Sequence, residues 1–300
     1  MSWLQLSIDT GESEAPLLEV VFENLGALSV TLGDAGDQPL LEPPPDSLPL
    51  WRETRVTALF PGESDLQALR AALEESLTPA LAGRLRWERI EERLWERVWL
   101  EHFKPMRFGR NLWICPSGEQ VDQVGSVVLE LDPGLAFGTG THPTTALCLE
   151  WLDGLDLRGK TLVDYGCGSG ILALAALKLG AARVLAVDHD PQALQASRDN
   201  ALKNGVGEAL MVCLPDAMPR ITADLLVANI LAEPLMTLAP TLCGLLRPGG
   251  RFALSGILEE QAAQVAARYH DFARLAPPRQ RDEWVLLEGV MGIACPTASV

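Results

Sequence analysis

Three alternating glycines between an apolar run and a helix-forming run constrain this chain more than any other feature. They lie in Val163–Leu172, which reads VDYGCGSGIL. Glycine is favoured where the backbone turns sharply or comes close to a ligand, because a Cβ atom would clash there. The helix that follows offers free N–H groups and the positive end of its dipole. Tight packing alone could also select these glycines, but the setting favours a strand, a ligand-binding loop and a helix.

From Lys160 onward, predicted strands and helices alternate, which is typical of a doubly wound parallel sheet. The expected strands are Thr161–Tyr165, Arg183–Asp188, Ala209–Cys213, Ala223–Asn229, Arg251–Gly256 and Glu283–Met291. The expected helices are Ile171–Leu179, Pro191–Asn204, Glu233–Leu246 and Glu259–Tyr269. Ligands of such sheets bind at the carboxyl ends of the strands, where the strand order reverses.

Two ligands are compatible with the glycine loop. Gly168-x-Gly170-x-x-Ala173 satisfies the dinucleotide fingerprint, and Asp188 follows Gly168 by 20 residues, so a nicotinamide-dependent oxidoreductase stays open. S-adenosylmethionine is favoured by Asp164, because a carboxylate before the first glycine suits a cationic amino-acid ligand better than a pyrophosphate. With either ligand we expect Asp188 to accept hydrogen bonds from ribose hydroxyls. The alternative for Asp188 is an N-cap-like turn residue before the helix expected from Pro191.

Asn229 ends the fourth expected strand, in the sequence Ala228-Asn229-Ile230-Leu231. Its side-chain carbonyl, beside exposed backbone carbonyls, could accept hydrogen bonds from an attacking amine and aim the lone pair of that amine. An amide cannot remove a proton as a carboxylate can. An asparagine at this position is also a common turn residue, so the motif gains weight only beside the glycine loop.

The run Phe137–Thr145, which reads FGTGTHPTT, precedes a helix expected to reach about Leu155. Pro143 suits a first helical position, so a helix cap explains Thr141 or His142. A cap does not explain why Gly138 and Gly140 alternate with hydroxyl residues. We therefore expect a polar loop that folds over a cofactor.

The first third of the chain reads as strand, helix, strand, strand, helix, strand, which predicts a ferredoxin-like plait. The expected strands are Trp3–Ile8, Ala27–Leu32, Arg55–Phe60 and Leu85–Glu91, and the helices are Ser13–Leu25 and Ser64–Leu81, with Ser64 as N-cap. The Pro-rich stretch Pro43–Pro45 cannot lie inside a strand. Residues 1–92 hold 17 Asp and Glu against six Arg and no Lys, a net charge of −11 within a total of −16. Such a surface could serve solubility alone or steer a basic partner.

A linker helix is expected over Leu94–Lys104, with Trp95, Trp99 and Phe103 on one face. Neighbouring arginines would allow a nucleic-acid patch, but packing against a domain is the preferred interpretation. Six scattered cysteines without a C-x-x-C pair argue against a zinc site and indicate reduced thiols in the cytoplasm. We expect no secretory signal, no membrane span and no metal.

Phe137–Thr145, the glycine loop, Asp188 and Asn229-Ile230-Leu231 together resemble the ribosomal protein L11 methyltransferase family, PrmA, over essentially the whole chain. The resemblance implies a substrate-recognition domain (1–92), a linker helix with connecting strands (93–132), a class I methyltransferase domain with a Rossmann-like α/β sheet (133–292) and a tail (293–300). It implies transfer of methyl groups from S-adenosylmethionine to the N-terminal amine and lysines of a basic, lysine-rich ribosomal protein. The implied cofactor contacts are Thr145, Gly166, Gly168, Asp188 and Asn229.

The expected mechanism is in-line attack of a neutral amine on the sulfonium methyl group, with Asn229 as the catalytic residue that orients the amine. No general base is named, and His142 is expected to structure its loop. We expect a monomer with neither membrane nor nucleic acid as a direct partner. Enzymes that methylate nucleic acids often place an aromatic residue after the Asn-led motif to stack a flipped base, whereas Leu231 and Ala232 follow here. A binding module that transfers no methyl group is the weakest alternative.

Overall fold

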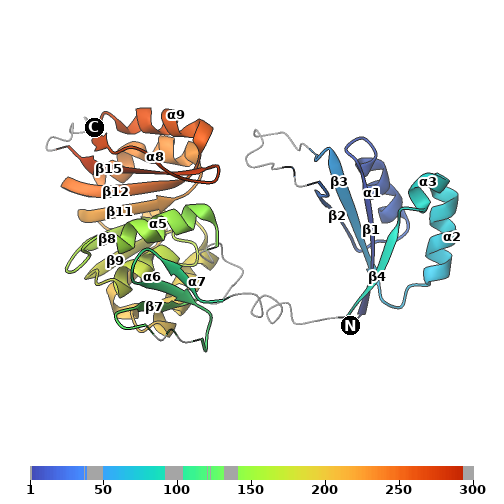
Figure 1. The fold of residues 1–300 in the computed structure, drawn as a ribbon, viewed down its shortest axis with the longest axis horizontal. Helices are drawn as coiled ribbons and strands as arrows, with labels where there is room; N and C mark the ends of the chain where they lie inside the picture. Colours follow the sequence, from blue (N-terminus) through green and yellow to red (C-terminus); the bar gives the residue numbers. More distant parts are fainter. Residues whose placement is uncertain are drawn as a thin grey trace. The chain divides into compact units, whose positions relative to one another are not determined.

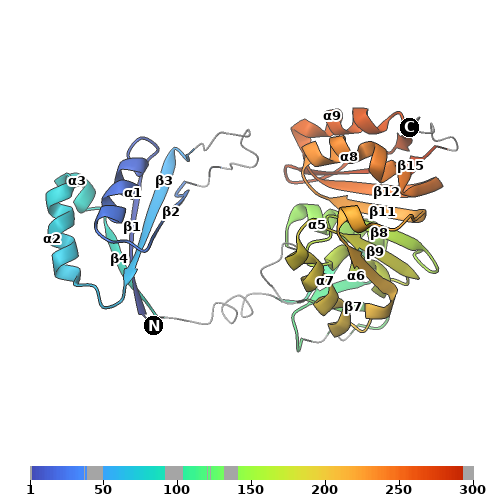
Figure 2. The same ribbon diagram turned by 180° about the vertical axis from the view of Figure 1, so that it is seen from behind.

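The computed structural model describes residues 2–36, 38, 50–91, 104–119, 121, 123–131 and 141–292. The chain forms two compact units, Met1–Leu94 and Trp95–Val300, whose folds Figures 1 and 2 show from opposite sides. The predicted Pro43–Pro45 stretch, the linker aromatics Trp95, Trp99 and Phe103, and the tail after Gly292 lie outside the described residues. Within the described part of the chain, no helix is both long and apolar enough to cross a membrane.

The first unit is a four-stranded antiparallel sheet with helices packed on one face, and the predicted plait is confirmed. The strands lie side by side in the order β2-β3-β1-β4. Alternate residues of the central strand, such as Leu6 and Ile8, are buried beneath Phe22 of α1 in one apolar core. The elements are β1 (Ser2–Gly11), α1 (Ala15–Asn24), β2 (Ser29–Asp34), β3 (Glu53–Pro61), α2 (Leu66–Ser76), α3 (Pro79–Ala82) and β4 (Arg86–Glu91).

The helix expected over Ser64–Leu81 is two helices, and its predicted N-cap is wrong. Asp65 caps α2, since its side chain accepts the N–H groups of Gln67 and Ala68. Thr78 adopts an extended conformation with ψ of 151° and separates α2 from α3. The cause is Pro79, which disfavours the helical conformation at the residue before it.

The second unit is built on a mixed sheet whose strands lie in the order β10-β9-β8-β11-β12-β15-β13, with β14 paired to β15. The predicted parallel run is present, but β15 is antiparallel to β12 and to β13. The strands are β8 (Thr161–Tyr165), β9 (Arg183–Val187), β10 (Leu210–Cys213), β11 (Ala223–Asn229), β12 (Leu246–Leu258), β13 (Ala273–Leu275), β14 (Arg279–Arg281) and β15 (Trp284–Met291). The order reverses between β8 and β11, which predicts a ligand site at their carboxyl ends.

Helices cover both faces of this sheet (Figures 1 and 2). One apolar core joins α5, α6 and α7 to residues such as Leu162 and Val184, and a second joins α8 and α9 to the alternate residues Val163 and Leu185. The helices are α5 (Pro143–Asp153), α6 (Ile171–Lys178), α7 (Pro191–Lys203), α8 (Ala232–Gly244) and α9 (Glu259–Tyr269). Each side of every central strand is therefore buried, as expected for an α/β sheet.

A smaller three-stranded sheet precedes α5, within residues 93–132, where the sequence predicts connecting strands without giving their bounds. It consists of β5 (Met106–Phe108), β6 (Leu112–Cys115) and β7 (Val127–Glu130), with β6 antiparallel to β5 and parallel to β7. Asn204, the C-cap of α7, fastens this sheet to the main domain. Its side chain accepts the Glu130 N–H at 2.8 Å and donates to the Glu130 carbonyl at 2.7 Å.

Candidate functional site

The glycine loop connects β8 to α6 at the point where the strand order reverses, and all three glycines have positive φ: 80° at Gly166, 54° at Gly168 and 82° at Gly170. A Cβ atom at Gly166 would collide with the Ile230 side chain, and one at Gly170 would lie 2.8 Å from the Ser197 hydroxyl oxygen. The close approach of neighbouring elements therefore selects glycine at these two positions.

Helix α7 holds the loop from behind. Its Ser197 hydroxyl donates to the Gly168 carbonyl at 3.0 Å, and the Asn200 amide donates to the Ser169 carbonyl at 2.9 Å. Ser197 is fully buried. These two bonds fix the carbonyls on one side of the loop, so its other side remains directed toward the carboxyl ends of the strands.

Asp188 follows β9 and accepts two backbone N–H groups. Its Oδ2 accepts the Gly168 N–H at 2.9 Å, and its Oδ1 accepts the Asp190 N–H at 3.0 Å. The carboxylate is 8% exposed, and the ring of His189 lies beside it, with 3.5 Å between Nδ1 and Oδ1. The N-cap of α7 is Asp190, through the Gln192 N–H, while the contact of Asp188 with the Asp190 N–H forms a turn directly before this helix, as the turn alternative predicts. Asp188 also joins the loops after β8 and β9.

Asp164 lies in β8 with its side chain fully buried. One oxygen, Oδ2, accepts the Ala173 N–H at 2.9 Å, whereas Oδ1 has no hydrogen-bond partner among the described residues. Burial raises the pKa of Asp164 to about 7, and the charge of Asp188 adds to this effect. An unpaired buried acceptor is costly. Asp164 Oδ1 is thus an acceptor that a cationic or N–H-bearing group could satisfy.

Asn229 ends β11, and its amide is oriented by α5. The Nδ2 atom donates to the hydroxyl oxygen of Thr145 at 3.3 Å. Thr145 is only 1% exposed, so this partner is held in the protein interior. This contact orients the amide group, and its carbonyl oxygen Oδ1 is the atom that can accept a hydrogen bond from a ligand.

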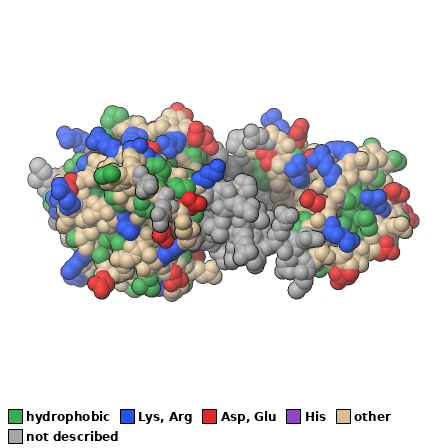
Figure 3. Space-filling model, turned by 60° about the horizontal axis from the view of Figure 1, so that its bottom comes forward, with side chains coloured by type: hydrophobic (Ala, Val, Ile, Leu, Met, Phe, Trp, Pro, Cys, Tyr) green, Lys and Arg blue, Asp and Glu red, His purple; other side chains and the backbone are tan. Residues whose placement is uncertain are grey.

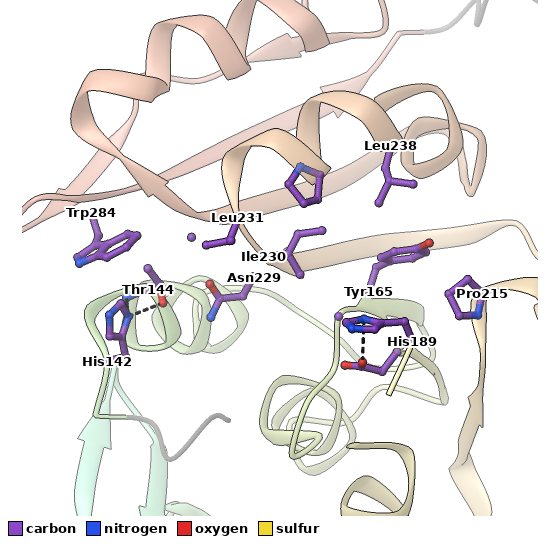
Figure 4. A pocket seen from close by; sticks show the side chains of 14 residues that line it. His142, Thr144, Tyr165, His189, Pro215, Asn229, Ile230, Leu231, Leu238 and Trp284 are labelled. Atoms are coloured by element: carbon purple, nitrogen blue, oxygen red, sulfur yellow. Dashed lines mark hydrogen bonds and ion pairs between the residues drawn. The ribbon is translucent and has the colours of Figure 1, made fainter. Parts of the chain in front are cut away.

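His142 is the N-cap of α5, which is the loop-structuring role expected for it. Its Nδ1 accepts the Thr144 N–H at 3.4 Å and lies 2.7 Å from the Thr144 hydroxyl. Burial lowers the pKa of His142, while Glu283 opposes this shift. The edge of its ring meets Trp284 of β15 with 4.9 Å between the ring centroids. An aromatic pair therefore stands beside Asn229 and Thr144 (Figure 4).

These residues surround one cavity of about 530 Å³. Figure 4 shows Trp284 and His142 at one end, Tyr165 and His189 at the other, and Asn229 between them. The lining residues are His142, Thr144, Tyr165, Gly166, Asp188, His189, Pro215, Asn229, Ile230, Leu231, Pro234, Leu238, Gly256 and Trp284.

Three of the predicted site residues, Gly166, Asp188 and Asn229, line this cavity together. The other two do not line it: Thr145 lies behind Asn229, and Gly168 lies behind Asp188, each one hydrogen bond away. Of the predicted glycine-threonine loop, residues 137–140 lie outside the described residues. No cluster that could hold a metal ion occurs in the part of the chain that the structure describes.

Sequence reasoning missed several lining residues that come from distant segments. Trp284 belongs to β15 and carries no local motif. Gly256 had a detectable signal, a glycine inside a strand, and its φ of 84° brings the backbone against that of Ile230. Pro234 and Leu238 lie on α8, where their spacing indicates only a helix face.

A family model and two named relatives match this chain over nearly its whole length. The family model described as ribosomal protein L11 methyltransferase (PrmA) matches residues 2–291. A protein of that name from Azotobacter vinelandii is 55% identical over 291 residues, covering 97% of this chain and 99% of its own length. The one from Hahella chejuensis is 53% identical over 289 residues, covering 96% and 98%. The crystal structure of a ribosomal protein L11 methylase from Lactobacillus delbrueckii subsp. bulgaricus is 34% identical with a TM-score of 0.58, covering 63% of this chain and 100% of that one.

Proposed function

The chain belongs to the ribosomal protein L11 methyltransferase family, and we propose that it transfers methyl groups from S-adenosylmethionine to the N-terminal amine and to lysine side chains of that ribosomal protein. The observation that carries this proposal is the convergence of Gly166, Asp188 and Asn229 on one cavity. Gly166 and Asp188 suit a nucleoside, and Asn229 suits an amine.

The donor set at one end of the cavity fits S-adenosylmethionine. Asp188 offers a nearly buried carboxylate to ribose hydroxyls, and the bare backbone of Gly166 leaves room for close approach. Asp164 does not line the cavity itself. It directly precedes the lining residues Tyr165 and Gly166, and its buried Oδ1 has no partner among the described residues. S-adenosylmethionine supplies a methyl group on a positively charged sulfur, from which an amine can accept it in an in-line displacement.

Asn229 is the residue we propose as catalytic. Its Oδ1 would accept an N–H of the incoming amine and so hold the nitrogen lone pair in one direction. Bound S-adenosylmethionine would supply the methyl group to that lone pair, with its sulfur as the leaving group, and water would take the proton that the methylated nitrogen releases. Orientation of this kind can supply ~7–11 kcal/mol of the barrier. Thr145 fixes the amide by accepting from Nδ2 at 3.3 Å.

The amine must arrive neutral, because a protonated amine has no lone pair. The reference pKa is ~10.4 for lysine and ~7.7–8.0 for an α-amine, so lysine arrives mostly protonated. We propose that the amine loses its water at the end of the cavity lined by Trp284, and that this desolvation favours its neutral form. His142 is not proposed as the base, because its Nδ1 already caps α5.

A nicotinamide-dependent oxidoreductase is disfavoured by the glycine loop itself. The Gly168 N–H, which a dinucleotide-binding loop would direct to a pyrophosphate, donates to Asp188 at 2.9 Å. Methylation of nucleic acid is disfavoured because the residues after Asn229 include Leu231, which is 52% exposed and aliphatic, at the position where an aromatic would stack a base.

The acidic first unit is the proposed docking site for the ribosomal protein, which we take to be basic and lysine-rich. The first 51 residues contain nine Asp and Glu and no Lys or Arg. On the face shown in Figure 3, acidic and basic side chains are interspersed rather than gathered into one patch. Helix α1 is the more specific candidate, because Leu17 and Val20 are 61% and 54% exposed beside its glutamates. We further propose a cytoplasmic, monomeric enzyme that acts neither on membranes nor directly on nucleic acid.

Mass spectrometry tests the proposal directly. Purified ribosomal protein L11 is incubated with the enzyme and S-adenosylmethionine, and the product is digested to locate the modified amines. We expect methyl groups on the N-terminal amine and on lysines. Methylation confined to other residue types, or reduction and oxidation chemistry with NAD in place of methyl transfer, would overturn it.

A further inference from the structure

One carboxylate of α5 holds two arginines of β14, away from the residues that line the cavity. Glu150 Oε1 accepts from Arg281 Nη2 at 2.7 Å, and Glu150 Oε2 lies 3.3 Å from Arg279 Nη2. The Glu150 side chain is 24% exposed, whereas the two arginine side chains are 41% and 40% exposed. The carboxylate is therefore the more enclosed partner, and it separates two like charges.

The β14–β15 hairpin connects this ion pair to the cavity. Arg281 lies directly opposite Trp284 in the strand register. Trp284 lines the cavity and is 8% exposed, and its ring meets the edge of His142. His142 is the N-cap of α5, the helix that carries Glu150. The helix and the hairpin thus meet twice, once at the ion pair and once at the aromatic pair beside Asn229.

The hairpin is fastened on its other side by a neutral side chain. Gln280 Nε2 donates to the Glu259 carboxylate of α9 at 2.9 Å and to the Asp282 carbonyl at 2.9 Å. That contact ties the hairpin to α9 and not to α5. On the α5 side, Glu150 supplies the ion pairs to the hairpin, and Trp284 is also paired with Leu258 of β12.

We propose that Glu150 is a positioning residue for the amine end of the cavity. Through Arg279 and Arg281 it holds the hairpin against α5, so that Trp284 and His142 keep the spacing through which an amine reaches Asn229. This inference rests on the proposed function. Neutralising Glu150 leaves two arginines facing each other without a counter-charge, which loosens the hairpin at the amine end. The Gly166–Asp188 end, which lies on other strands, is unaffected.

The test is Glu150→Gln, with Glu260→Gln as the matched control. Glu260 is an exposed first-turn residue of α9 beside Glu259, and its carboxylate makes no ion pair or hydrogen bond with the described residues of the hairpin, so the control repeats the loss of one charge without removing a contact. We expect kcat/KM for ribosomal protein L11 to fall roughly tenfold in Glu150→Gln, since small displacements of reacting groups are costly, while the Kd for S-adenosylmethionine stays within about twofold. Glu260→Gln should match wild type.

Arg281→Gln examines the same connection from the hairpin side. Because the two residues act through one contact, the double variant Glu150→Gln/Arg281→Gln should be no worse than the poorer single variant. If Glu150→Gln does not fold, Arg281→Gln must show the same selective loss. Additive losses, wild-type kcat/KM in either single variant, or an equal loss of cofactor affinity would overturn the inference. Wild-type enzyme that fails to methylate the ribosomal protein would instead overturn the proposed function.

Discussion

The amide of Asn229 donates from Nδ2 to the hydroxyl oxygen of Thr145 at 3.3 Å, across the boundary between β11 and α5. Thr145 is nearly fully buried, so the contact fixes which end of the amide remains for a ligand. A residue that does not line the cavity therefore determines how a lining residue presents its carbonyl. The orientation of Asn229 is a property of the packing of two elements and not of the Asn-Ile-Leu motif alone.

Replacement of Thr145 by valine removes the acceptor and keeps the shape of the side chain. One hydrogen bond contributes ~1 kcal/mol, so we expect kcat to fall about fivefold as the Asn229 amide loses its preferred orientation. Thr145→Ser retains the hydroxyl and should stay near wild type. Steady-state methylation of ribosomal protein L11 by both variants measures this, and equal rates for valine and serine would refute the orienting role.

Gly166→Ala should abolish measurable cofactor binding. The new Cβ atom would occupy the position of the Ile230 side chain, and a φ of 80° strains any residue with a Cβ. Gly159→Ala is the matched control, since Gly159 has a φ of 71° and no atom within 4 Å of the added Cβ. Equilibrium binding of S-adenosylmethionine to both variants separates the effect of the collision from that of backbone strain, because only Gly166→Ala introduces a collision. The double variant Gly166→Ala/Ile230→Ala should recover part of the affinity, and no recovery would contradict a steric cause.

The sequence pattern predicted the central elements well because each is strongly periodic and buried. Strands β8 and β11 and helix α9 have the predicted bounds, and most other boundaries differ by one or two residues. Strands β5, β6 and β7 were expected only as connecting strands without bounds, and β13 and β14 were missed, because three or four residues carry too little periodicity. The antiparallel direction of β15 is likewise a tertiary property that no local pattern encodes.

The candidate site was only partly predictable. Gly166, Asp188 and Asn229 follow strands of one sheet, so their convergence is a consequence of topology. Trp284 reaches the same cavity from the end of the chain through the β14–β15 hairpin, and its neighbours in sequence give no indication of this. The position of Asp164 before the first glycine predicts that it suits a cationic ligand, whereas the burial of one of its oxygens without a partner among the described residues is a property of the packed structure.

The buried Asp164 makes stability depend on pH. Burial raises its pKa to about 7 from a usual value of 3.8, so the folded protein binds this proton more tightly than the unfolded chain does. The resulting stabilisation is fully present below about pH 4 and is lost as the pH rises through 7. We expect wild type to lose up to ~1.4 kcal/mol per pH unit in this window relative to Asp164→Asn. Denaturant unfolding of both proteins at several pH values measures this difference. If the unfolding free energies of the two proteins changed with pH in parallel, the raised pKa of Asp164 would be contradicted.

Leu17 and Val20 on α1 give a direct test of the docking surface. Leu17→Ser/Val20→Ser should raise KM for ribosomal protein L11 severalfold and leave the Kd for S-adenosylmethionine unchanged, because exposed apolar side chains contribute through burial on binding. Leu202→Ser, at a 72% exposed leucine of α7, is the control. Added salt should weaken capture of the ribosomal protein more than cofactor binding. An unchanged KM in the double variant, or an equal salt response of both affinities, would argue against α1 as the docking surface.

We propose that the Gly166–Asp188 end of the cavity binds S-adenosylmethionine and that Asn229 orients the amine. Both roles are tested together by measuring the Kd for S-adenosylmethionine and kcat in Asp188→Ala and Asn229→Ala. Loss of a charged acceptor costs ~1.5–3 kcal/mol, so Asp188→Ala should weaken cofactor binding at least tenfold. Asn229→Ala should mainly lower kcat. Full turnover by Asn229→Ala, or unchanged cofactor affinity in Asp188→Ala, would contradict the account.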